Sequence, residues 1–468
     1  MSITLRIKKM AEKVPPQFGY LLKGMPYDRR LGKRYNFFRE QFESFDALNV
    51  QQQKDTLFQQ VHKRTREAYD QIPFYRDFLY GQGIHPNDLK TFEDLQKLPL
   101  ITKKILKTVE LPQRSYIHNT LGLFNTGGTS GNPLGFYLDA DHYCREWAFM
   151  HQMWNRVGYS PDQMKLTVRG KNVGDRLYKY NLSQNEFILD AYRNYTREDF
   201  ESLSRMIRRY GIKFLHGYPS SIYMLLKQAE AYPFFGALLK ERIKGIIFCS
   251  EFPVPAYRDY IESIVTENTL SFYGHTEGCV MAGELYRKFE FVPYHAYGYT
   301  EAVADGDTYH LVSTSQYNQC APFIRYDTED LIEPVFADGL LQSFQIKQGR
   351  TSDFIEDRNG AAISLTSFFF GRHHPVYHHA DYLQVEQVGK GKIIIYLVAK
   401  KPIPDPKVYF DLGNFFFDIE FKMIDVPFRT PAGKVPFLIR KQAKTRFPTP
   451  KIIKRLIMKL TIVAGARP

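Results

Sequence analysis

The sequence predicts an α/β fold, with a large multi-layer N-terminal domain and a smaller α+β domain at the C-terminus. Between residues 198 and 273, strand-like and helical segments alternate, which is typical of parallel α/β layers. After Asp353 the chain changes to short strands with little helix, and 468 residues are too many for one ordinary core. We therefore predict domains at 1–353 and 354–445, followed by a basic amphipathic tail at 446–468.

The first half of the chain gives three helical patterns after an irregular lead-in over residues 1–50. Apolar residues recur near helical spacing from Gln51 to Ile72, and a helix there should stop before Pro73, because the residue before a proline avoids the α region. The other two predicted helices lie at 91–98 and 137–156.

The second half alternates and then becomes mostly strand. The predicted helices are 198–209, 220–230 and 255–265, and the predicted strands between them are 212–216, 243–250 and 269–273. Residues 308–313 and 340–345 predict a meander or small barrel. In the small domain we predict strands at 382–387, 392–399 and 415–424, with one short helix near 406–412.

Composition excludes several classes of protein. The chain is 44% hydrophobic and 15% aromatic, so it is not globally disordered. Its four cysteines are scattered without a CxxC pair, which argues against a disulfide framework or zinc ribbon and predicts a reducing cytoplasm. No signal-peptide pattern opens the chain, and no apolar run approaches the ~18–20 residues that span a bilayer. A soluble cytoplasmic protein is expected.

Positive charge is concentrated at the end of the chain. The net charge is +13, but nine lysines and arginines lie between Arg440 and Arg467, and no acidic residue follows Asp425. Without those nine cations the net charge is +4, so no nucleic-acid partner is predicted. As a helix, Lys451–Val463 would carry an apolar arc opposite its cations. Such a helix either docks on its own domain or contacts the inner face of the membrane peripherally.

A glycine-rich stretch, Phe124-Asn-Thr-Gly-Gly-Thr-Ser-Gly-Asn-Pro-Leu134, is the main candidate for ligand binding. Glycines let backbone N–H groups crowd around a small anion, and the hydroxyls add donors, which together suit a phosphate. No lysine follows the last glycine, so the stretch is not a P-loop. An ordinary hairpin turn between strands at 121–124 and 135–138 is the open alternative.

Four later motifs also carry chemistry. Ser271–Gly278 offers an aromatic ring, a hydroxyl and a carboxylate after a strand, suited to a base, a phosphate and Mg²⁺, although a strand end with a satisfied Glu is equally open. Ile324–Leu331 clusters three acids, one of which could bind both ribose hydroxyls. Gly349–Asp353 is a turn with a cation and a candidate hinge, and Thr430–Lys434 is a turn that presents one lysine.

These motifs, in this order, resemble the adenylate-forming superfamily. The closer likeness is to the phenylacetate–CoA ligase family, in the branch found in capsular polysaccharide biosynthesis. It covers roughly residues 50–440 and includes five further segments: 72–76, 98–103, 216–220, 250–251 and 382–387.

The resemblance implies a role for each matching residue. The residues that match the loop holding the ATP phosphates are Thr126, Gly128, Thr129, Ser130 and Gly131. Tyr273 matches the residue against adenine, Thr276 a phosphate contact and Glu277 the Mg²⁺ ligand. Asp330 matches the ribose-binding acid, with Arg350 beside it. Asp353 matches the hinge of a mobile small domain, and Lys434 the lysine that bridges the carboxylate and the α-phosphate during adenylation.

Three positions depart from the family pattern. Asn132 stands where many relatives have lysine, Asp327 replaces a frequent arginine, and Glu329 replaces a glycine. A histidine-rich segment, 372–379, is also unusual. It can be a metal site, but Pro375 interrupts it and no cysteine supports it, so we favour a loop at the active site or domain interface.

Together these observations predict an ATP- and Mg²⁺-dependent ligase. It would activate a small-molecule carboxylic acid as acyl-AMP and transfer the acyl group to CoA, a carrier protein or a sugar, in surface polysaccharide biosynthesis. An aryl- or acyl-CoA ligase of general metabolism is the nearest alternative. A non-catalytic nucleotide-binding scaffold at the membrane surface is the alternative from another class.

Overall fold

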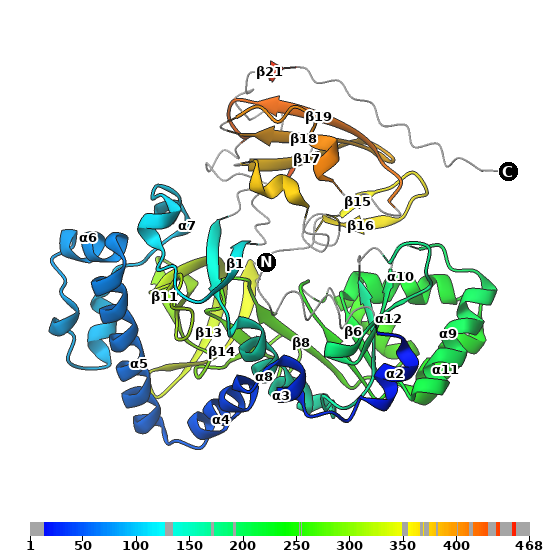
Figure 1. The fold of residues 1–468 in the computed structure, drawn as a ribbon, viewed down its shortest axis with the longest axis horizontal. Helices are drawn as coiled ribbons and strands as arrows, with labels where there is room; N and C mark the ends of the chain where they lie inside the picture. The colour runs from blue at the N-terminus through cyan, green and yellow to red at the C-terminus, as the bar shows by residue number, and fades with distance from the viewer. Residues whose placement is uncertain are drawn as a thin grey trace.

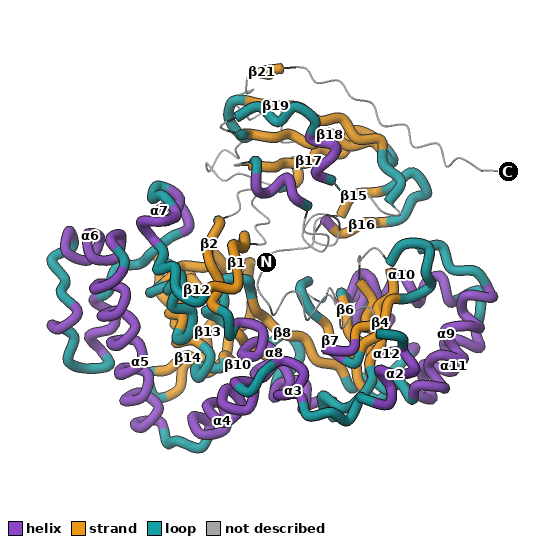
Figure 2. Tube along the Cα trace, viewed as in Figure 1, coloured by secondary structure: helices purple, strands orange, loops and turns teal. Residues whose placement is uncertain are grey.

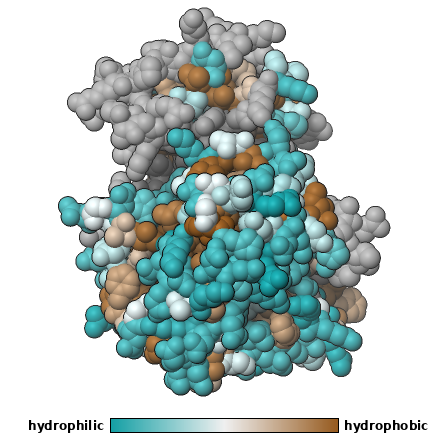
Figure 3. Space-filling model, turned by 90° about the vertical axis from the view of Figure 1, so that its left-hand side faces the viewer, coloured by the Kyte–Doolittle hydropathy of each residue, from teal (hydrophilic) through white to brown (hydrophobic). Residues whose placement is uncertain are grey.

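The chain folds into a large lower part and a smaller upper part (Figures 1 and 2). The computed structural model describes, besides Pro253 and Phe368, residues 14–126, 134–169, 173–190, 193–251, 255–348, 354–365, 374–380, 382–399, 401–410, 415–428, 437–439 and 452–454. On its left side the lower part presents a mostly hydrophilic face, with hydrophobic side chains gathered beneath the upper part (Figure 3).

Between Pro16 and Asp46 the chain is mostly helical, so the expected irregular lead-in is wrong over that range, whereas residues 1–13 lie outside the described part. The helices of the N-terminal region are α2 (Pro16–Leu21), α3 (Tyr27–Leu31), α4 (Arg34–Asp46), α5 (Val50–Gln71), α6 (Pro73–Gly81) and α7 (Lys103–Lys107). Buried Tyr35 and Phe38 hold α4 in an aromatic core. The predicted helix at 51–72 is confirmed as α5, which the Asn49 side chain caps at its start.

The helix predicted from Tyr137 is wrong at its start. Residues Gly135–Asp139 form strand β2, which pairs antiparallel with β1 (Thr120–Asn125). Side chains of β2 alternate in burial, as a strand requires. Helix α8 (His142–Trp154) begins only afterwards. The hairpin strands expected on either side of the glycine-rich stretch are therefore confirmed, whereas residues 127–133 of the stretch lie outside the described part.

An eight-stranded sheet in the order β10-β9-β8-β7-β6-β3-β5-β4 forms the centre of the lower part. Its strands are β3 (Lys165–Arg169), β4 (Lys179–Asn181), β5 (Glu186–Asp190), β6 (Phe214–Gly217), β7 (Gly245–Phe248), β8 (Thr269–Gly274), β9 (Met281–Gly283) and β10 (Val292–Pro293). Strands β5, β3, β6, β7 and β8 run parallel. Helices between them are α9 (Arg197–Tyr210), α10 (Pro219–Ala229), α11 (Pro233–Arg242) and α12 (Pro255–Ile264). The predicted alternation is confirmed.

The expected meander is an antiparallel sheet in the order β11-β12-β13-β14. Its strands are β11 (Gly298–Asp305), β12 (Thr308–Ser315), β13 (Tyr326–Ala337) and β14 (Leu340–Gln348). Short 3-10 helices connect many of the larger elements: η1 (Pro86–Asp88), η2 (Glu93–Lys97), η3 (Leu111–Arg114), η4 (Asn155–Val157), η5 (Leu182–Gln184), η7 (Pro375–His378) and η8 (Pro406–Tyr409).

The upper part contains a hairpin and a five-stranded sheet. The hairpin strands are β15 (Phe354–Glu356) and β16 (Ala362–Ser364). The sheet, in the order β20-β17-β18-β19-β21, contains β17 (Tyr382–Gly389), β18 (Lys392–Val398), β19 (Asp418–Ile424), β20 (Leu438–Ile439) and β21 (Ile452–Lys454). Because β21 pairs with β19, the helix expected from Lys451 is wrong over Ile452–Lys454. The remainder of that predicted helix lies outside the described residues.

Candidate active site

Three residues predicted to bind the nucleotide lie at or just after the end of β8, at the carboxyl edge of the parallel strands: Tyr273, Thr276 and Glu277. In an open α/β sheet, ligands bind outside this edge. Strand β8 ends at Gly274, and the turn after it carries His275, Thr276 and Glu277. Thr276 is partly buried and Glu277 is buried. The chain therefore brings its hydroxyl and carboxylate to the edge where the fold places a ligand.

Two residues predicted to bind adenosine lie in contact. The Tyr273 hydroxyl, at the end of β8, donates a hydrogen bond of 2.5 Å to Oδ2 of Asp330 on β13. The two residues are 57 positions apart in sequence, and Asp330 is buried. The fold therefore joins the predicted adenine contact and the predicted ribose acid into one site.

His275 lies in the candidate site although no role was predicted for it. Its Nδ1 lies 3.1 Å from Oε2 of Glu277, and its Nε2 lies 3.6 Å from Sγ of Cys279. Burial opposes a charged imidazole, but Cys279 and Glu277 together raise the pKa of His275. The imidazole fixes the orientation of the Glu277 carboxylate. The only sequence signal was its place inside the Tyr-Gly-x-Thr-Glu motif.

The segment at residues 98–103 packs directly beside the acidic segment at residues 324–331. A β-bridge joins Ile101 to Tyr326, and the Arg325 guanidinium donates to the backbone oxygens of Gln96 and Leu98 at 2.7 and 2.5 Å. Arg325 also pairs with buried Glu301 at 3.2 Å. Residues 98–103 and 324–331 therefore lie side by side, and the first segment supports the start of β13, the strand that carries Asp330.

Both departures in the acidic motif lie in one bulge of β13, where its register with β12 shifts between Asp327 and Leu331. Glu329 has a φ of +64°, a left-handed conformation in which glycine is the least strained residue. The Glu329 N–H donates to Oδ1 of Asp327 at 2.7 Å, and His310 lies 3.1 Å from Oδ2 of Asp327. Asp327 therefore stabilises the bulge in which Glu329 adopts a positive φ.

Thr126 closes the base of the glycine-rich loop. Its N–H donates to the Leu134 carbonyl at 2.9 Å, and its Oγ1 accepts from the Leu134 N–H at 3.0 Å. The predicted residues that lie outside the described part of the chain are Gly128, Thr129, Ser130, Gly131, Arg350, Asp353 and Lys434. Their roles stay predictions.

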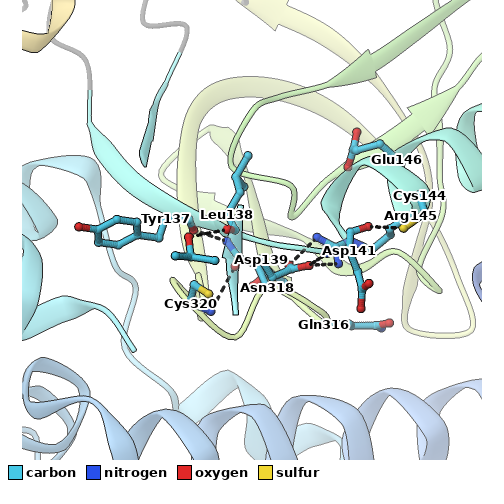
Figure 4. A network of polar contacts seen from close by, with 12 residues as sticks. Tyr137, Leu138, Asp139, Asp141, Cys144, Arg145, Glu146, Gln316, Asn318 and Cys320 are labelled. Atoms are coloured by element: carbon cyan, nitrogen blue, oxygen red, sulfur yellow. Dashed lines mark hydrogen bonds and ion pairs between the residues drawn. The ribbon is translucent and has the colours of Figure 1, made fainter. Parts of the chain in front are cut away.

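A buried ion pair fixes the start of α8 against β2. Arg145 makes two contacts with Asp139 on β2, of 3.2 and 2.9 Å (Figure 4). Asn318 donates to the Tyr137 carbonyl at 3.0 Å and so ties β2 to the segment after β12. Neighbouring Glu146 points away from this network (Figure 4) and accepts a hydrogen bond from the Tyr297 hydroxyl. Burial raises the pKa of Glu146 to about 7.

The histidine-rich segment has a packing role where it is described. Buried His374 lies with its Nε2 2.7 Å from the Phe368 carbonyl oxygen, and its ring lies 4.8 Å from that of Phe410. Within the described residues, no group of three or more His, Cys, Asp or Glu side chains could hold a metal ion. No helix in the same ranges is long and apolar enough to cross a membrane.

Comparison with known proteins gives consistent matches over most of the chain. It is 22% identical to CapK of Staphylococcus aureus over 426 residues, which cover 84% of this chain and 92% of CapK. It is 27% identical to the phenylacetate-coenzyme A ligase of Pseudomonas putida over 321 residues, 62% of this chain and 67% of that protein. No family model matches.

Among solved structures, the fold matches 2-hydroxyisobutyryl-CoA ligase in its postadenylation state. The TM-score is 0.51 at 15% identity, and the alignment covers 85% of this chain and 92% of that one. The predicted architecture, a large α/β domain with a smaller C-terminal α+β domain, is therefore confirmed.

Proposed function

We propose that this chain, which belongs to the adenylate-forming superfamily in the branch of CapK and the phenylacetate–CoA ligases, activates a carboxylic acid as acyl-AMP with ATP. The observation that carries the proposal is the 2.5 Å contact between Tyr273 and Asp330. It places an aromatic ring and a carboxylate side by side, as recognition of a base and its ribose requires. Glu277 follows four residues after Tyr273, where the phosphates would extend.

The chemistry depends on charge neutralisation and positioning. A carboxylate and the α-phosphate repel each other, so cations and fixed donors supply most of the catalysis. Magnesium holds phosphates with one or two carboxylates and several waters, and a single Glu277 fits that pattern. The loop that Thr126 closes would bind the phosphates, and Lys434 would bridge the acid and the α-phosphate. A carboxylate oxygen would bond to the α-phosphorus as pyrophosphate leaves, and AMP would leave in turn when an acceptor attacks the acyl carbon.

The setting we propose is surface polysaccharide biosynthesis in the cytoplasm. The similarity to CapK extends over 92% of that protein, more than the 67% for the phenylacetate-coenzyme A ligase. Free, buried cysteines agree with a reducing compartment. An aryl- or acyl-CoA ligase is the second candidate, supported by the higher identity of 27% to a CoA ligase.

ATP–pyrophosphate exchange tests the proposal directly. Purified protein with Mg²⁺ and a panel of aromatic, fatty, hydroxy and amino acids should show exchange that depends on one class of acid. Asp330→Asn should lower that exchange about 10- to 100-fold, because charged hydrogen bonds contribute about 1.5–3 kcal/mol. Asp307→Asn, in the exposed turn between β11 and β12, is the matched control. Exchange that is indifferent to Asp330→Asn would refute the site. ATP binding without exchange for any acid would favour the scaffold alternative, and failure to bind ATP would refute the assignment of the glycine-rich loop.

A further inference from the structure

A cavity of about 410 Å³ lies between the two parts of the molecule. Its volume falls in the range of small-molecule sites, which occur preferentially at domain interfaces. Helices α10 and α12 form one side, and the β15–β16 hairpin above them forms the other (Figure 1). Both helices begin just after β6 and β7 end, so the cavity lies toward the carboxyl edge that also presents the candidate active site.

One wall of the cavity is aromatic. The rings of Tyr223 and Tyr257 are stacked, with centroids 4.4 Å apart at an angle of 28°. Phe354, the first residue of β15, meets Tyr257 edge to face at 6.0 Å. The face of an aromatic ring is electron-rich, so this wall suits the weakly positive C–H groups on one side of a sugar ring.

The polar side chains of the described lining are three neutral amides, one carboxylate and one lysine, besides the tyrosine hydroxyls. Asn194 and Asn359 are exposed, and neither side chain has a hydrogen-bond partner among the described residues. Gln228 accepts from the Tyr195 N–H at 2.9 Å through Oε1, which leaves its NH₂ as a donor. Oδ1 of buried Asp357 accepts two backbone N–H groups of its own turn, each at 2.9 Å. An amide donates and accepts in one plane, which matches vicinal hydroxyls.

Positive charge is scarce among the described residues that line the cavity. Lys227 is the one lysine or arginine among the described lining residues, and it already pairs with Glu230 at 2.5 Å. Coenzyme A carries several phosphate charges, and phosphate recognition relies on arginine and lysine. Asp357, on the opposite wall, adds a negative charge. The lining therefore favours an uncharged, hydroxyl-rich ligand over CoA.

We propose that this cavity binds the acyl acceptor and that the acceptor is a sugar. The inference rests on the proposed ligase function. A sugar hydroxyl oxygen attacks the acyl carbon of acyl-AMP, and the bond from that carbon to the phosphate oxygen breaks. AMP leaves with the electron pair, the hydroxyl proton passes to solvent, and an ester forms. Since both parts of the molecule line the cavity, the acceptor site exists only in this arrangement of the two parts.

Saturation-transfer NMR on the full chain tests the cavity without any turnover. N-acetylglucosamine, galactose and glucose are each offered at millimolar concentration, and CoA is offered separately. At least one sugar should receive saturation, and Asn359→Ala should weaken its binding about tenfold, equivalent to one lost hydrogen bond of about 1.4 kcal/mol. Asn87→Ala, which removes an equally exposed amide on η1, is the matched control and should bind the sugar like wild type.

The outcomes separate the two proposals. Sugar binding that Tyr223→Ala and Asn359→Ala both weaken supports the cavity, even if the wild-type protein shows no pyrophosphate exchange. In that case only the ligase proposal fails. No sugar binding, or binding that both variants leave unchanged, overturns the acceptor inference. Binding of CoA that is sensitive to Asn359→Ala assigns the cavity to a thiol acceptor and overturns the sugar.

Discussion

Single residues in the bulge of β13 between Asp327 and Asp330 show how two departures from the expected family pattern are accommodated. A non-glycine residue in the left-handed region costs roughly 1–2 kcal/mol. Glu329 has a φ of +64°, and the Asp327 carboxylate accepts a hydrogen bond from the Glu329 N–H. Asp330, the predicted ribose-binding acid, follows immediately. We propose that Asp327 and Glu329 act as a pair that keeps Asp330 in reach of Tyr273.

Replacing Glu329 tests whether the bulge of β13 is strained. We expect Glu329→Gly to be more stable than Glu329→Ala by about 1 kcal/mol, because alanine keeps the Cβ that opposes a positive φ and glycine removes it. Both variants lack the carboxylate, so the difference between their stabilities reports the backbone conformation. Urea unfolding measures the free energy of unfolding of each variant. Equal stabilities for the two variants would show that the bulge is unstrained.

At the same scale, the sequence predicted individual site residues only through the order of motifs. Tyr273 and Asp330 were paired as adenosine contacts although 57 residues separate them, and the structure joins them. His275 was missed, because nothing local to a Gly-His-Thr turn shows that both ring nitrogens face Glu277 and Cys279. Such pairings depend on how the turn is folded, which residue type and spacing do not determine.

Among the elements, the junction of β2 and α8 differs most clearly from the predicted secondary structure. Aromatic residues from Tyr137 onward fit a helical period, yet β2 continues to Asp139 because it pairs with β1. The hairpin alternative at 121–124 and 135–138 contains this pairing, but the local pattern does not decide between that hairpin and a helix from Tyr137. In contrast, the boundaries of α5 are predicted well, because the Asn49 cap and Pro73 set them locally. The start of α8 depends instead on the pairing of β2 with β1.

We expect the Asp139–Arg145 ion pair to stabilise the junction of β2 and α8. Removing one partner of a buried ion pair leaves an uncompensated charge, which costs about 3–5 kcal/mol. Arg145 is 1% exposed, so we expect Asp139→Asn to destabilise the chain by about 3 kcal/mol. Asp55→Asn on the exposed side of α5 is the comparison. If thermal unfolding of the two variants coincides, the pair does not anchor β2 to α8.

At the scale of the whole molecule, we propose that adenylation and acyl transfer require different arrangements of the lower and upper parts. The boundary predicted at Asp353 lies between β14 and β15, that is, between the lower and upper parts, but outside the described residues. The cavity between α10, α12 and the hairpin exists only while the parts are arranged as they are here. We therefore propose that Lys434, the lysine predicted to serve adenylation, acts in a different step from the one in which the acceptor is held.

Lys434→Ala should impair the adenylation step and leave the acyl-transfer step intact. Loss of a cation at the developing phosphate charge should lower ATP–pyrophosphate exchange about 10²- to 10³-fold. Acyl transfer from preformed acyl-AMP, made from the acid that exchange identifies, should continue near the wild-type rate, because no bond to pyrophosphate remains to be broken. Lys401→Ala, an exposed lysine of the upper part, controls for loss of charge. Equal loss of both half-reactions would show that Lys434 supports the fold or both steps, and retained exchange would remove the lysine from the adenylation site.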